Sequence, residues 1–254
     1  MSKIALITGA TAGIGEACAH VFARERYDLI ITGRRADRLE KLAKQLKTEY
    51  NVEVITSSFD VRNREDVISR LEELPPEWKK VNVLINNAGL SQGLDPIQSG
   101  SYDDWETMID TNVKGLLYVS RVVSNWMISN GFGHIVNLGS VAGKEVYPNG
   151  NVYCATKHAV DALNKAMRID LLQYGIKVTA VHPGAVETEF SEVRFKGDKD
   201  RAKKVYAGFE PLVALDIAET IWFAVSRPAH VNINELIVMP TAQATATNIF
   251  RKNN

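Results

Sequence analysis

The chain has 254 residues, of which 45% are hydrophobic and 24% charged, and equal numbers of basic and acidic residues give a formal net charge of +0. This composition is typical of one globular domain with a sizeable core, and a neutral chain lacks the basic field that would attract nucleic acid or an anionic membrane. Cys18 and Cys154 form no disulfide framework and no segment resembles a signal peptide or a membrane span, so we expect a cytoplasmic protein without nucleic-acid or membrane partners.

A glycine-rich turn connects the first expected strand, residues 3–8, to a helix over residues 14–26. Glycines allow a tight turn and a close approach of the backbone to a ligand, and the start of a helix offers N–H groups to a diphosphate. The spacing G-x-x-x-G-x-G differs from the common G-x-G-x-x-G fingerprint, and an ordinary glycine turn would look the same. The position between the first strand and the first helix favours a diphosphate site. Its expected residues are Gly9, Ala10, Thr11, Ala12, Gly13, Ile14 and Gly15.

Two arginines, Arg34 and Arg35, follow the second expected strand, residues 28–32. In alternating strand–helix folds this position lies near the adenosine ribose, where an NAD enzyme carries an acidic residue. Two guanidinium groups suit a ribose 2′-phosphate instead. They could also be solvated side chains at the start of the next helix, but the helix dipole opposes cations there. We therefore favour phosphate binding and NADP(H) as the cofactor.

The third and fourth expected strands, residues 52–56 and 81–85, lead to further candidate cofactor contacts. Asp60 could accept a hydrogen bond from an adenine amino group or cap the helix that begins near Arg64, and the residues leave both alternatives open. Paired asparagines after the fourth strand can hold the backbone of a loop, and small residues beside them leave room for a flat ligand. The expected contacts in these two segments are Asp60, Val61, Asn87, Ala88 and Gly89.

Three residues, Ser140, Tyr153 and Lys157, form a candidate catalytic group. Tyr153 and Lys157 are four positions apart on an expected helix over residues 151–174, so they share one face. Ser140 follows a strand-like run over residues 134–139 and can lie opposite that face, in the cleft where open α/β sheets bind ligands. A Y-x-x-x-K motif alone would usually be a solvated pair, but its place among the other motifs favours catalysis.

The chemistry of these side chains suits a carbonyl/alcohol pair. A lysine ammonium beside a tyrosine favours the phenolate, so we expect Tyr153 to exchange protons well below its free pKa of about 10. The hydroxyl of Ser140 can donate to a carbonyl oxygen or to the alkoxide formed from it. Asn112, within an expected helix over residues 105–129, is either an exposed amide or a ligand of a water molecule behind Lys157.

The C-terminal part of the chain completes the expected ligand edge. A turn after the sixth strand, residues 176–181, and a charged, irregular segment over residues 189–210 would cover the substrate as a lid. The expected cofactor contacts here are Pro183, Gly184, Val186 and Thr188. The helix over residues 151–174 is apolar or small around much of its girth, so one face should pack on the sheet and the other on a second subunit.

These motifs together resemble the short-chain dehydrogenase/reductase family in order and spacing. They are T-G-x-x-x-G-x-G from Thr8, N-N-A-G from Asn86, Asn112, Ser140, Y-x-x-x-K from Tyr153 and P-G from Pro183. The resemblance covers nearly the whole chain. It implies a single α/β domain over residues 1–254, with a doubly wound Rossmann fold, a seven-stranded parallel sheet and helices on both faces. It also implies a nicotinamide cofactor, no metal, and a homotetramer or homodimer.

Within the family the chain is similar to the NADP-dependent dehydrogenases of 3-hydroxy acids such as serine and allo-threonine. Stretches that carry this similarity include G-A-T-A-G-I-G, T-G-R-R and T-E-F-S-E-V-R-F-K-G-D. The resemblance implies that Tyr153 takes the hydroxyl proton, that Lys157 holds the nicotinamide ribose, and that Asn112 supports a water relay. The alternatives are a reductase of neutral ketones or steroids and, less favoured, a module that senses NADP without chemistry.

A 3-hydroxy acid carries a carboxylate, and burying it without a cation would be costly. Arg194 and Lys196 lie in the expected lid, and Lys144 closely follows Ser140. We choose Arg194 as the substrate contact because a planar guanidinium can hold a carboxylate through two bonds. All three side chains could instead be solvated surface charges.

Overall fold

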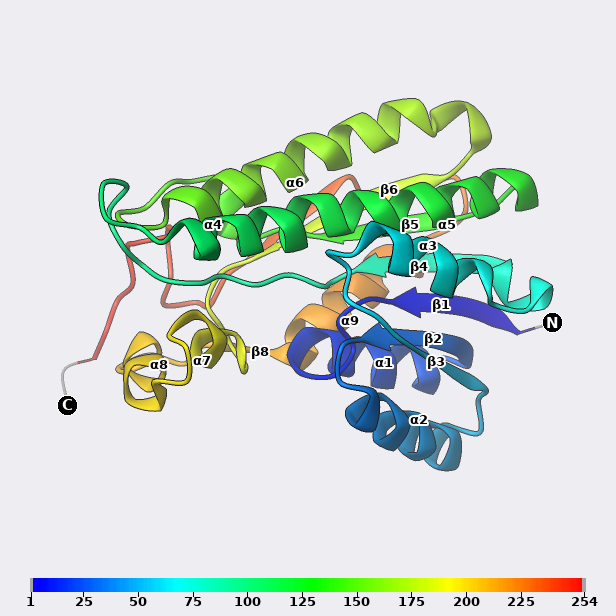
Figure 1. Cartoon of the computed structure of the whole chain (residues 1–254), viewed down its shortest axis with the longest axis horizontal. Coiled ribbons are helices and arrows are strands. Elements are labelled where there is room, and N and C mark those ends of the chain that lie inside the picture. The colour runs from blue at the N-terminus through cyan, green and yellow to red at the C-terminus, as the bar shows by residue number, and fades with distance from the viewer. Residues whose placement is uncertain (1, 253–254) are drawn as a thin grey trace.

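The computed structural model describes residues 2–252 and shows a parallel sheet of seven strands with helices on both faces (Figure 1). The spatial order of the strands is β3-β2-β1-β4-β5-β6-β9. The bounds are β1 Lys3–Ile7, β2 Tyr27–Gly33, β3 Val54–Ser58, β4 Val81–Asn86, β5 His134–Leu138, β6 Lys177–Pro183 and β9 Glu235–Val238. The order reverses between β1 and β4, the switch point where open sheets of this kind bind ligands. The predicted fold class is confirmed.

The strands are buried on both faces, as parallel strands between two helical layers should be. In β1, for example, Ala5 and Ile7 belong to one apolar core while Ile4 and Leu6 belong to the other. In Figure 1 one helical layer lies below the sheet and the other above it. The lower layer consists of α1 Gly13–Arg24, α2 Ala36–Tyr50 and α9 Ala214–Val225. The upper layer consists of α3 Arg64–Glu72, α4 Tyr102–Ile109, α5 Leu116–Asn130 and α6 Asn151–Asp170.

Local sequence signals explain several helix ends. The side chains of Asn63 and Ser101 accept hydrogen bonds from the backbone at the starts of α3 and α4, which satisfies N–H groups that a helix leaves unpaired. Helix α5 ends at Gly131 in the left-handed region, where a glycine is least strained. The predicted alternative in which Asp60 caps α3 is wrong, because Asn63 does so.

Some predicted bounds are wrong. The third strand starts two residues later than predicted, at Val54, because Val52 and Glu53 have no strand pairing. Helix α6 ends at Asp170 and is followed by a separate 3-10 turn, Leu172–Tyr174, before Gly175. The expected helix over residues 105–129 starts at Tyr102 and contains a π-helical stretch, Asp110–Gly115, between α4 and α5.

The segment over residues 189–210 was predicted to be irregular and is instead largely helical. It contains α7 Phe190–Arg194 and α8 Lys199–Val205, which lie apart from the two main layers in Figure 1. Two short strands, β7 Val186–Glu187 and β8 Leu212–Val213, pair at its base. Helix α8 is capped by the side chain of Asp198. The role of the segment as a lid stays a prediction.

Candidate functional site

A cavity of about 470 Å³ lies at the carboxyl ends of the central strands, which is a usual volume for a small-molecule site. The predicted site residues line it, except for Ala10, Gly15 and Asn112, which are buried next to it. The sequence motifs are therefore brought together from β1, β2, β4, β5, α6 and the segment after β6. Cavity residues that the sequence did not single out include Tyr147, Phe190, Tyr206 and Gln243.

Tyr153 and Ser140 both line this cavity, with the hydroxyl of Ser140 close enough to the phenol to favour its charged form. Ser140 lies in extended backbone directly after β5, and its hydroxyl oxygen also accepts a bond from the N–H of Ala142. Tyr153 is buried on the first turn of α6. Burial raises the pKa of Tyr153, and the charge of Arg194 and the nearby hydroxyl of Ser140 only partly oppose this. The predicted lowering of this pKa is therefore not what the structure shows.

Lys157 is buried one turn further along α6, where its ammonium donates to the carbonyl of Leu138 at 2.9 Å. The ammonium nitrogen lies 6.0 Å from the centre of the Tyr153 ring, so the two share one face of the helix as predicted. Burial lowers the pKa of Lys157 to about 8. The missing side chain of Gly89 keeps the space beside the ammonium open, because a Cβ there would lie 3.5 Å from Nζ.

Asn112 lies in the π-helical stretch with its side chain buried rather than exposed. Its amide oxygen accepts from the N–H of Leu90, and its amide nitrogen donates to the carbonyl of Leu90 and to the hydroxyl of Thr156. These bonds fasten the loop after β4 to α6, beside Lys157. A π-helical insertion often marks a functional position. The water relay through Asn112 stays a prediction.

The glycine turn fits a diphosphate. Gly9 and Gly13 have positive φ angles of 68° and 58°, which favour glycine, and a Cβ on Gly15 would lie 2.4 Å from the carbonyl oxygen of Gly9. Asn87 donates to the carbonyls of Thr8 and Gly9 and so holds the turn against the loop after β4. Helix α1 starts beside the cavity without a side-chain cap, which leaves its first N–H groups available to an anion.

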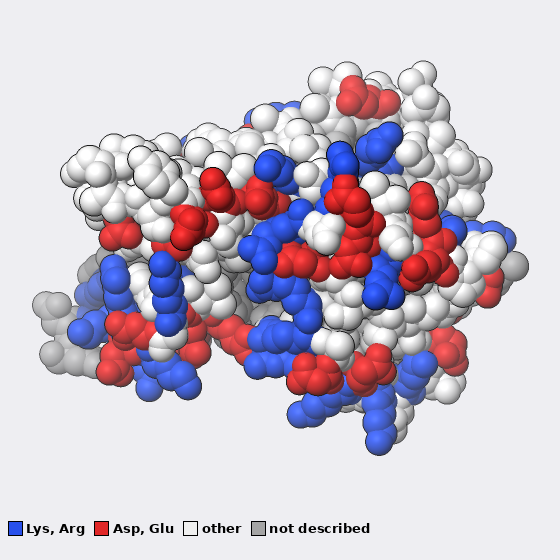
Figure 2. Space-filling model, viewed as in Figure 1, with Lys and Arg blue, Asp and Glu red and all other residues white. Residues whose placement is uncertain are grey.

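The two arginines after β2 border the same cavity, but both already have carboxylate partners. Arg34 lies 3.9 Å from Asp60, which also pairs with Arg62 at 2.7 Å. Arg35 donates to the hydroxyl of Thr11 at 2.8 Å and pairs with Glu189 at 3.0 Å. Figure 2 shows basic side chains gathered in the middle of this face, bordered by acidic ones.

Asp60 keeps its charge in this environment. Although burial alone would favour its protonated form, hydrogen bonds from Arg62 and the charges of Arg62 and Arg34 lower the pKa of Asp60. A charged carboxylate can accept from an amino group, so the predicted adenine contact remains chemically reasonable. It stays a prediction, as do the predicted phosphate contacts of Arg34 and Arg35.

Among the three candidate substrate cations, Arg194 lies in the cavity. Its guanidinium carbon is 5.2 Å from the centre of the Tyr153 ring and 5.1 Å from that of Phe190, and it donates to the hydroxyl of Tyr147 at 3.3 Å. Its Nε is buried without a hydrogen-bond partner among the described residues. Lys196 turns away to pair with Asp104 at 3.0 Å. Arg194 therefore offers unused hydrogen-bonding capacity next to Tyr153, the candidate catalytic tyrosine.

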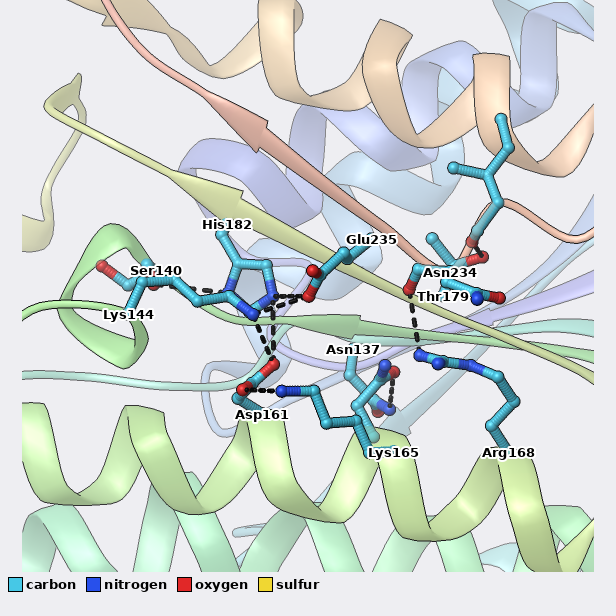
Figure 3. Close-up of polar contacts among 12 residues, drawn as sticks. Asn137, Ser140, Lys144, Asp161, Lys165, Arg168, Thr179, His182, Asn234 and Glu235 are labelled. Carbon is cyan, nitrogen blue, oxygen red and sulfur yellow. Dashed lines mark hydrogen bonds and ion pairs between the residues drawn. The ribbon is translucent and has the colours of Figure 1, made fainter. Parts of the chain in front are cut away.

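Lys144 does not line the cavity, and its side chain lies in a cluster of charged residues near Ser140 (Figure 3). Its ammonium lies 2.8 Å from Asp161 on α6 and 2.6 Å from Glu235 on β9. The same carboxylates and the buried ring of His182 come close enough together to hold a metal ion. Because the ammonium already bridges the two carboxylates, we interpret the cluster as an ion-pair network that ties the turn after Ser140 to α6.

His182 connects this network to Ser140, since its Nδ1 lies 3.3 Å from the carbonyl oxygen of Ser140. Its side chain is fully buried, and burial together with the charge of Lys144 lowers its pKa from 6.5 to about 4, against the opposing charge of Asp161. A histidine that stays neutral in the folded protein but is protonated in the unfolded chain makes stability depend on pH.

We therefore expect the protein to lose stability as the pH falls from 6.5 towards 4, because the unfolded chain then binds a proton that folded His182 does not. The contribution of one such histidine is about 1.4 kcal/mol per pH unit, or about 2 kcal/mol between pH 6.5 and 5. Urea unfolding at pH 7.5 and 5.0 would measure it, with His182→Asn as the comparison. Equal losses in the two proteins would show that His182 is not the group responsible.

The chain matches known proteins over most of its length. The sequence profile of the family described as short chain dehydrogenase matches residues 3–199. The NADP-dependent 3-hydroxy acid dehydrogenase YdfG of Salmonella typhi is 46% identical over 96% of this chain and 97% of its own length. Sulfoacetaldehyde reductase 2 of Chromohalobacter salexigens is 47% identical over 96% of both chains.

Solved structures agree with these sequence matches. The closed form of a serine dehydrogenase complexed with NADP+ superposes with a TM-score of 0.91 and 45% identity, covering 98% of this chain and all of the other. Serine dehydrogenase from Escherichia coli superposes with a TM-score of 0.81 and 40% identity, covering 95% and 99% of the two chains. The predicted family and its fold are confirmed: the chain belongs to the short-chain dehydrogenase/reductase family.

Proposed function

We propose that this chain transfers a hydride between NADP(H) and the 3-hydroxyl or 3-oxo carbon of a small 3-hydroxy acid, of the serine, allo-threonine or 3-hydroxypropionate type. The observation that carries this proposal is Arg194, a half-buried side chain beside Tyr153 whose buried Nε has no hydrogen-bond partner among the described residues. Relatives named as NADP-dependent 3-hydroxy acid dehydrogenases and a structure titled as a serine dehydrogenase with NADP+ support it. These names also confirm the predicted class, an oxidoreductase, and the predicted cofactor, NADP.

The side chains in the cavity have distinct roles in the proposed reaction. The bound cofactor accepts or supplies the hydride. Tyr153 takes the hydroxyl proton during oxidation and returns it during reduction, and Ser140 donates a hydrogen bond to the substrate oxygen. Lys157 provides a donor and a positive charge on the same face of α6. The glycine turn from Gly9, together with Asn87, would hold the cofactor diphosphate.

Arg194 would bind the anionic end of the substrate. A carboxylate moved from water into the cavity needs a charge-assisted partner, and a guanidinium supplies two parallel N–H donors. Tyr147, which accepts a bond from Arg194, would help to orient it. A sulfonate could use the same donors, and one relative is named sulfoacetaldehyde reductase 2. Reduction of a small sulfonated aldehyde is therefore our second candidate function.

The most informative test of the substrate class is a panel of serine, allo-threonine, 3-hydroxypropionate, sulfoacetaldehyde and neutral ketones, assayed with NADP+ or NADPH. Turnover of hydroxy acids well above all other compounds would support the first proposal. The highest kcat/KM on sulfoacetaldehyde would favour the second candidate. Turnover confined to neutral ketones or steroids would favour the carbonyl reductase alternative. Binding of NADP without turnover of any compound would favour a sensing module.

Replacing Arg194 by methionine should lower kcat/KM for serine or 3-hydroxypropionate by about ten-fold or more, because a hydrogen bond to a charged group contributes about 1.5–3 kcal/mol. The loss on a neutral ketone should be much smaller. The matched control is Lys196→Met, which removes a lid cation that pairs with Asp104 outside the cavity. Equal losses on charged and neutral substrates would indicate a damaged lid, and an unchanged value on serine would remove Arg194 from the site.

We also propose a cytoplasmic homotetramer or homodimer. Its support is an apolar surface near the end of α6, where Ile169 and Leu172 are about three-quarters exposed. Such exposed apolar side chains usually mark a contact with another chain.

Both cysteines are free and buried, in keeping with a reducing compartment. Within residues 2–252, no helix is both long and apolar enough to cross a membrane.

A further inference from the structure

Ser140 and Lys144 are the two ends of one tight turn just after β5. The N–H of Gly143 donates to the carbonyl of Ser140 at 2.8 Å, and the N–H of Lys144 donates to the carbonyl of Val141 at 2.9 Å. The hydroxyl oxygen of Ser140 accepts from the N–H of Ala142 within the same turn. The position of the turn therefore sets where the Ser140 hydroxyl lies, and whatever holds the Lys144 end also restrains the Ser140 end.

Two carboxylates from other elements hold the ammonium of Lys144 (Figure 3). It lies 2.8 Å from Oδ1 of Asp161 on α6 and 2.6 Å from Oε2 of Glu235 on β9. Burial alone would lower the pKa of Lys144, but the bonds to Asp161 and Glu235 raise it, so the ammonium stays charged. The side chains of Lys144 and Asp161 are only 20% and 12% exposed, so water and salt screen this pair less than a surface ion pair.

Asp161 lies on the same face of α6 as the two candidate catalytic side chains of that helix. Tyr153, Lys157 and Asp161 are spaced by four positions, so they follow one another along one side of the helix. The turn also packs directly on this helix, because a Cβ on Gly143 would lie 2.6 Å from the carbonyl oxygen of Lys157. The ion pair to Asp161 thus joins the turn that carries Ser140 to the helix face that carries Tyr153.

His182 restrains the start of the same turn from β6. Its fully buried ring packs against the backbone just before Ser140, where a Cβ on Gly139 would clash with the ring Nδ1. The same Nδ1 lies 3.3 Å from the carbonyl oxygen of Ser140. With the first residues of the turn held in this way, Lys144 is the side chain that fixes its last residue.

We propose that Lys144 is a positioning residue for Ser140. Its ion pairs hold the turn against α6, and so they set how the Ser140 hydroxyl lies relative to the Tyr153 hydroxyl and to a substrate oxygen bound by both. The proposal rests on the proposed roles of Ser140 and Tyr153 but not on the substrate class. Without the ammonium, Asp161 would keep its pair with Lys165 inside α6, and the end of the turn would lose its charged partners on α6 and β9.

The test is a double-mutant cycle on kcat, measured with NADPH and the best substrate of the unmodified protein. Lys144→Met should lower kcat by about ten- to hundred-fold, since a misplacement of about 1 Å at a reacting group can cost about 100-fold. The KM for NADPH should stay within a few-fold, because Lys144 does not line the cavity. In protein that already carries Ser140→Ala, the same substitution should lower kcat by less than about three-fold, because effects that act through one group do not add.

Lys165→Met is the matched control, because Lys165 pairs with the other oxygen of Asp161 at 2.7 Å but does so within α6. Its kcat should be nearly unchanged. Lys144→Arg should recover most of the activity lost in Lys144→Met, because a guanidinium can keep both carboxylates paired. Glu235→Gln weakens the same contact from its more exposed side and replaces Lys144→Met in the cycle if that variant does not fold.

The outcomes separate this role from the function on which it rests. A loss of kcat that is equally large in the Ser140→Ala background would overturn the proposal, because Lys144 would then act through the fold or another group. An unchanged kcat in Lys144→Met would overturn it as well. If Ser140→Ala alone keeps full activity, the proposed role of Ser140 is wrong, and the positioning role falls with it. A best substrate that is a neutral ketone would contradict the proposed substrate class and leave the cycle valid.

Discussion

Replacing Tyr153 by phenylalanine should lower kcat by about 10²–10⁴-fold, the usual contribution of a general acid–base group. The affinity for NADPH should stay within a few-fold of the original value, because the substitution removes one hydroxyl and keeps the ring. That ring packs 5.7 Å from the ring of Phe190 and lies beside the guanidinium of Arg194, so the apolar wall of the cavity survives. Initial rates with the best substrate and a fluorescence titration of NADPH would measure the two quantities.

The matched control is Tyr147→Phe, which removes a hydroxyl from a second, half-buried tyrosine near Arg194. Burial raises the pKa of both tyrosines, so burial alone does not distinguish them. Their neighbours do, because the Ser140 hydroxyl lies close to Tyr153 whereas Tyr147 accepts a hydrogen bond from Arg194. Tyr147→Phe should therefore act mainly on KM. Substantial turnover by purified Tyr153→Phe would assign proton transfer to another group.

The location of the site could be predicted because its signals are local in the sequence. Tyr153 and Lys157 share a face through helix geometry alone, and Ser140 and Asn87 each follow a strand whose end must lie at the same edge of the sheet. The glycine turn is equally local, since Gly9 and Gly13 are required by their own positive φ angles. Such features can be predicted from the sequence alone, because they do not depend on contacts between distant parts of the chain.

The partners of the charged side chains could not be predicted, because they come from distant parts of the chain. Glu189 meets Arg35 across 154 positions, and Lys144 meets Glu235 across 91. Lys144 is the candidate cation nearest to Ser140 in sequence, yet it turns towards α6 and β9 rather than the cavity. The predicted direction of the Tyr153 pKa shift was wrong for the same reason, because burial by the surrounding residues raises this pKa.

The predicted lid, residues 189–210, shows a second limit of structure prediction from the sequence. Its helices are short, and Phe190–Arg194 spans little more than one turn, so hydrophobic periodicity has too few repeats to be recognised. The C-terminal tail had no predicted structure either. It packs on the lid through Arg251, which donates to the carbonyl of Val205, and it places Gln243 in the cavity wall. These elements are held by tertiary contacts rather than by their own propensity.

The protein should use NADP in strong preference to NAD, and Arg35→Met should lower kcat/KM for NADP by about ten- to hundred-fold while changing the value for NAD much less. A charge-assisted hydrogen bond to phosphate contributes about 1.5–3 kcal/mol, and the exposure of the Arg35 side chain, 40%, favours the lower end of that range. No acidic residue directly follows β2 to bind a ribose 2′-hydroxyl, since Arg34 and Arg35 are there instead.

The control for that experiment is Arg38→Met, which removes the neighbouring arginine that also pairs with Glu189 but does not line the cavity. If the loss in Arg35→Met came only from freeing Glu189, Arg38→Met would cause a similar loss. If Arg35 binds the phosphate directly, Arg38→Met should leave kcat/KM for NADP within a few-fold, because Arg35 keeps its bonds to Thr11. Steady-state kinetics with both cofactors, in all three proteins, distinguish these cases. Equal kcat/KM for NADP and NAD in the unmodified protein would contradict the preference itself, whatever the variants do.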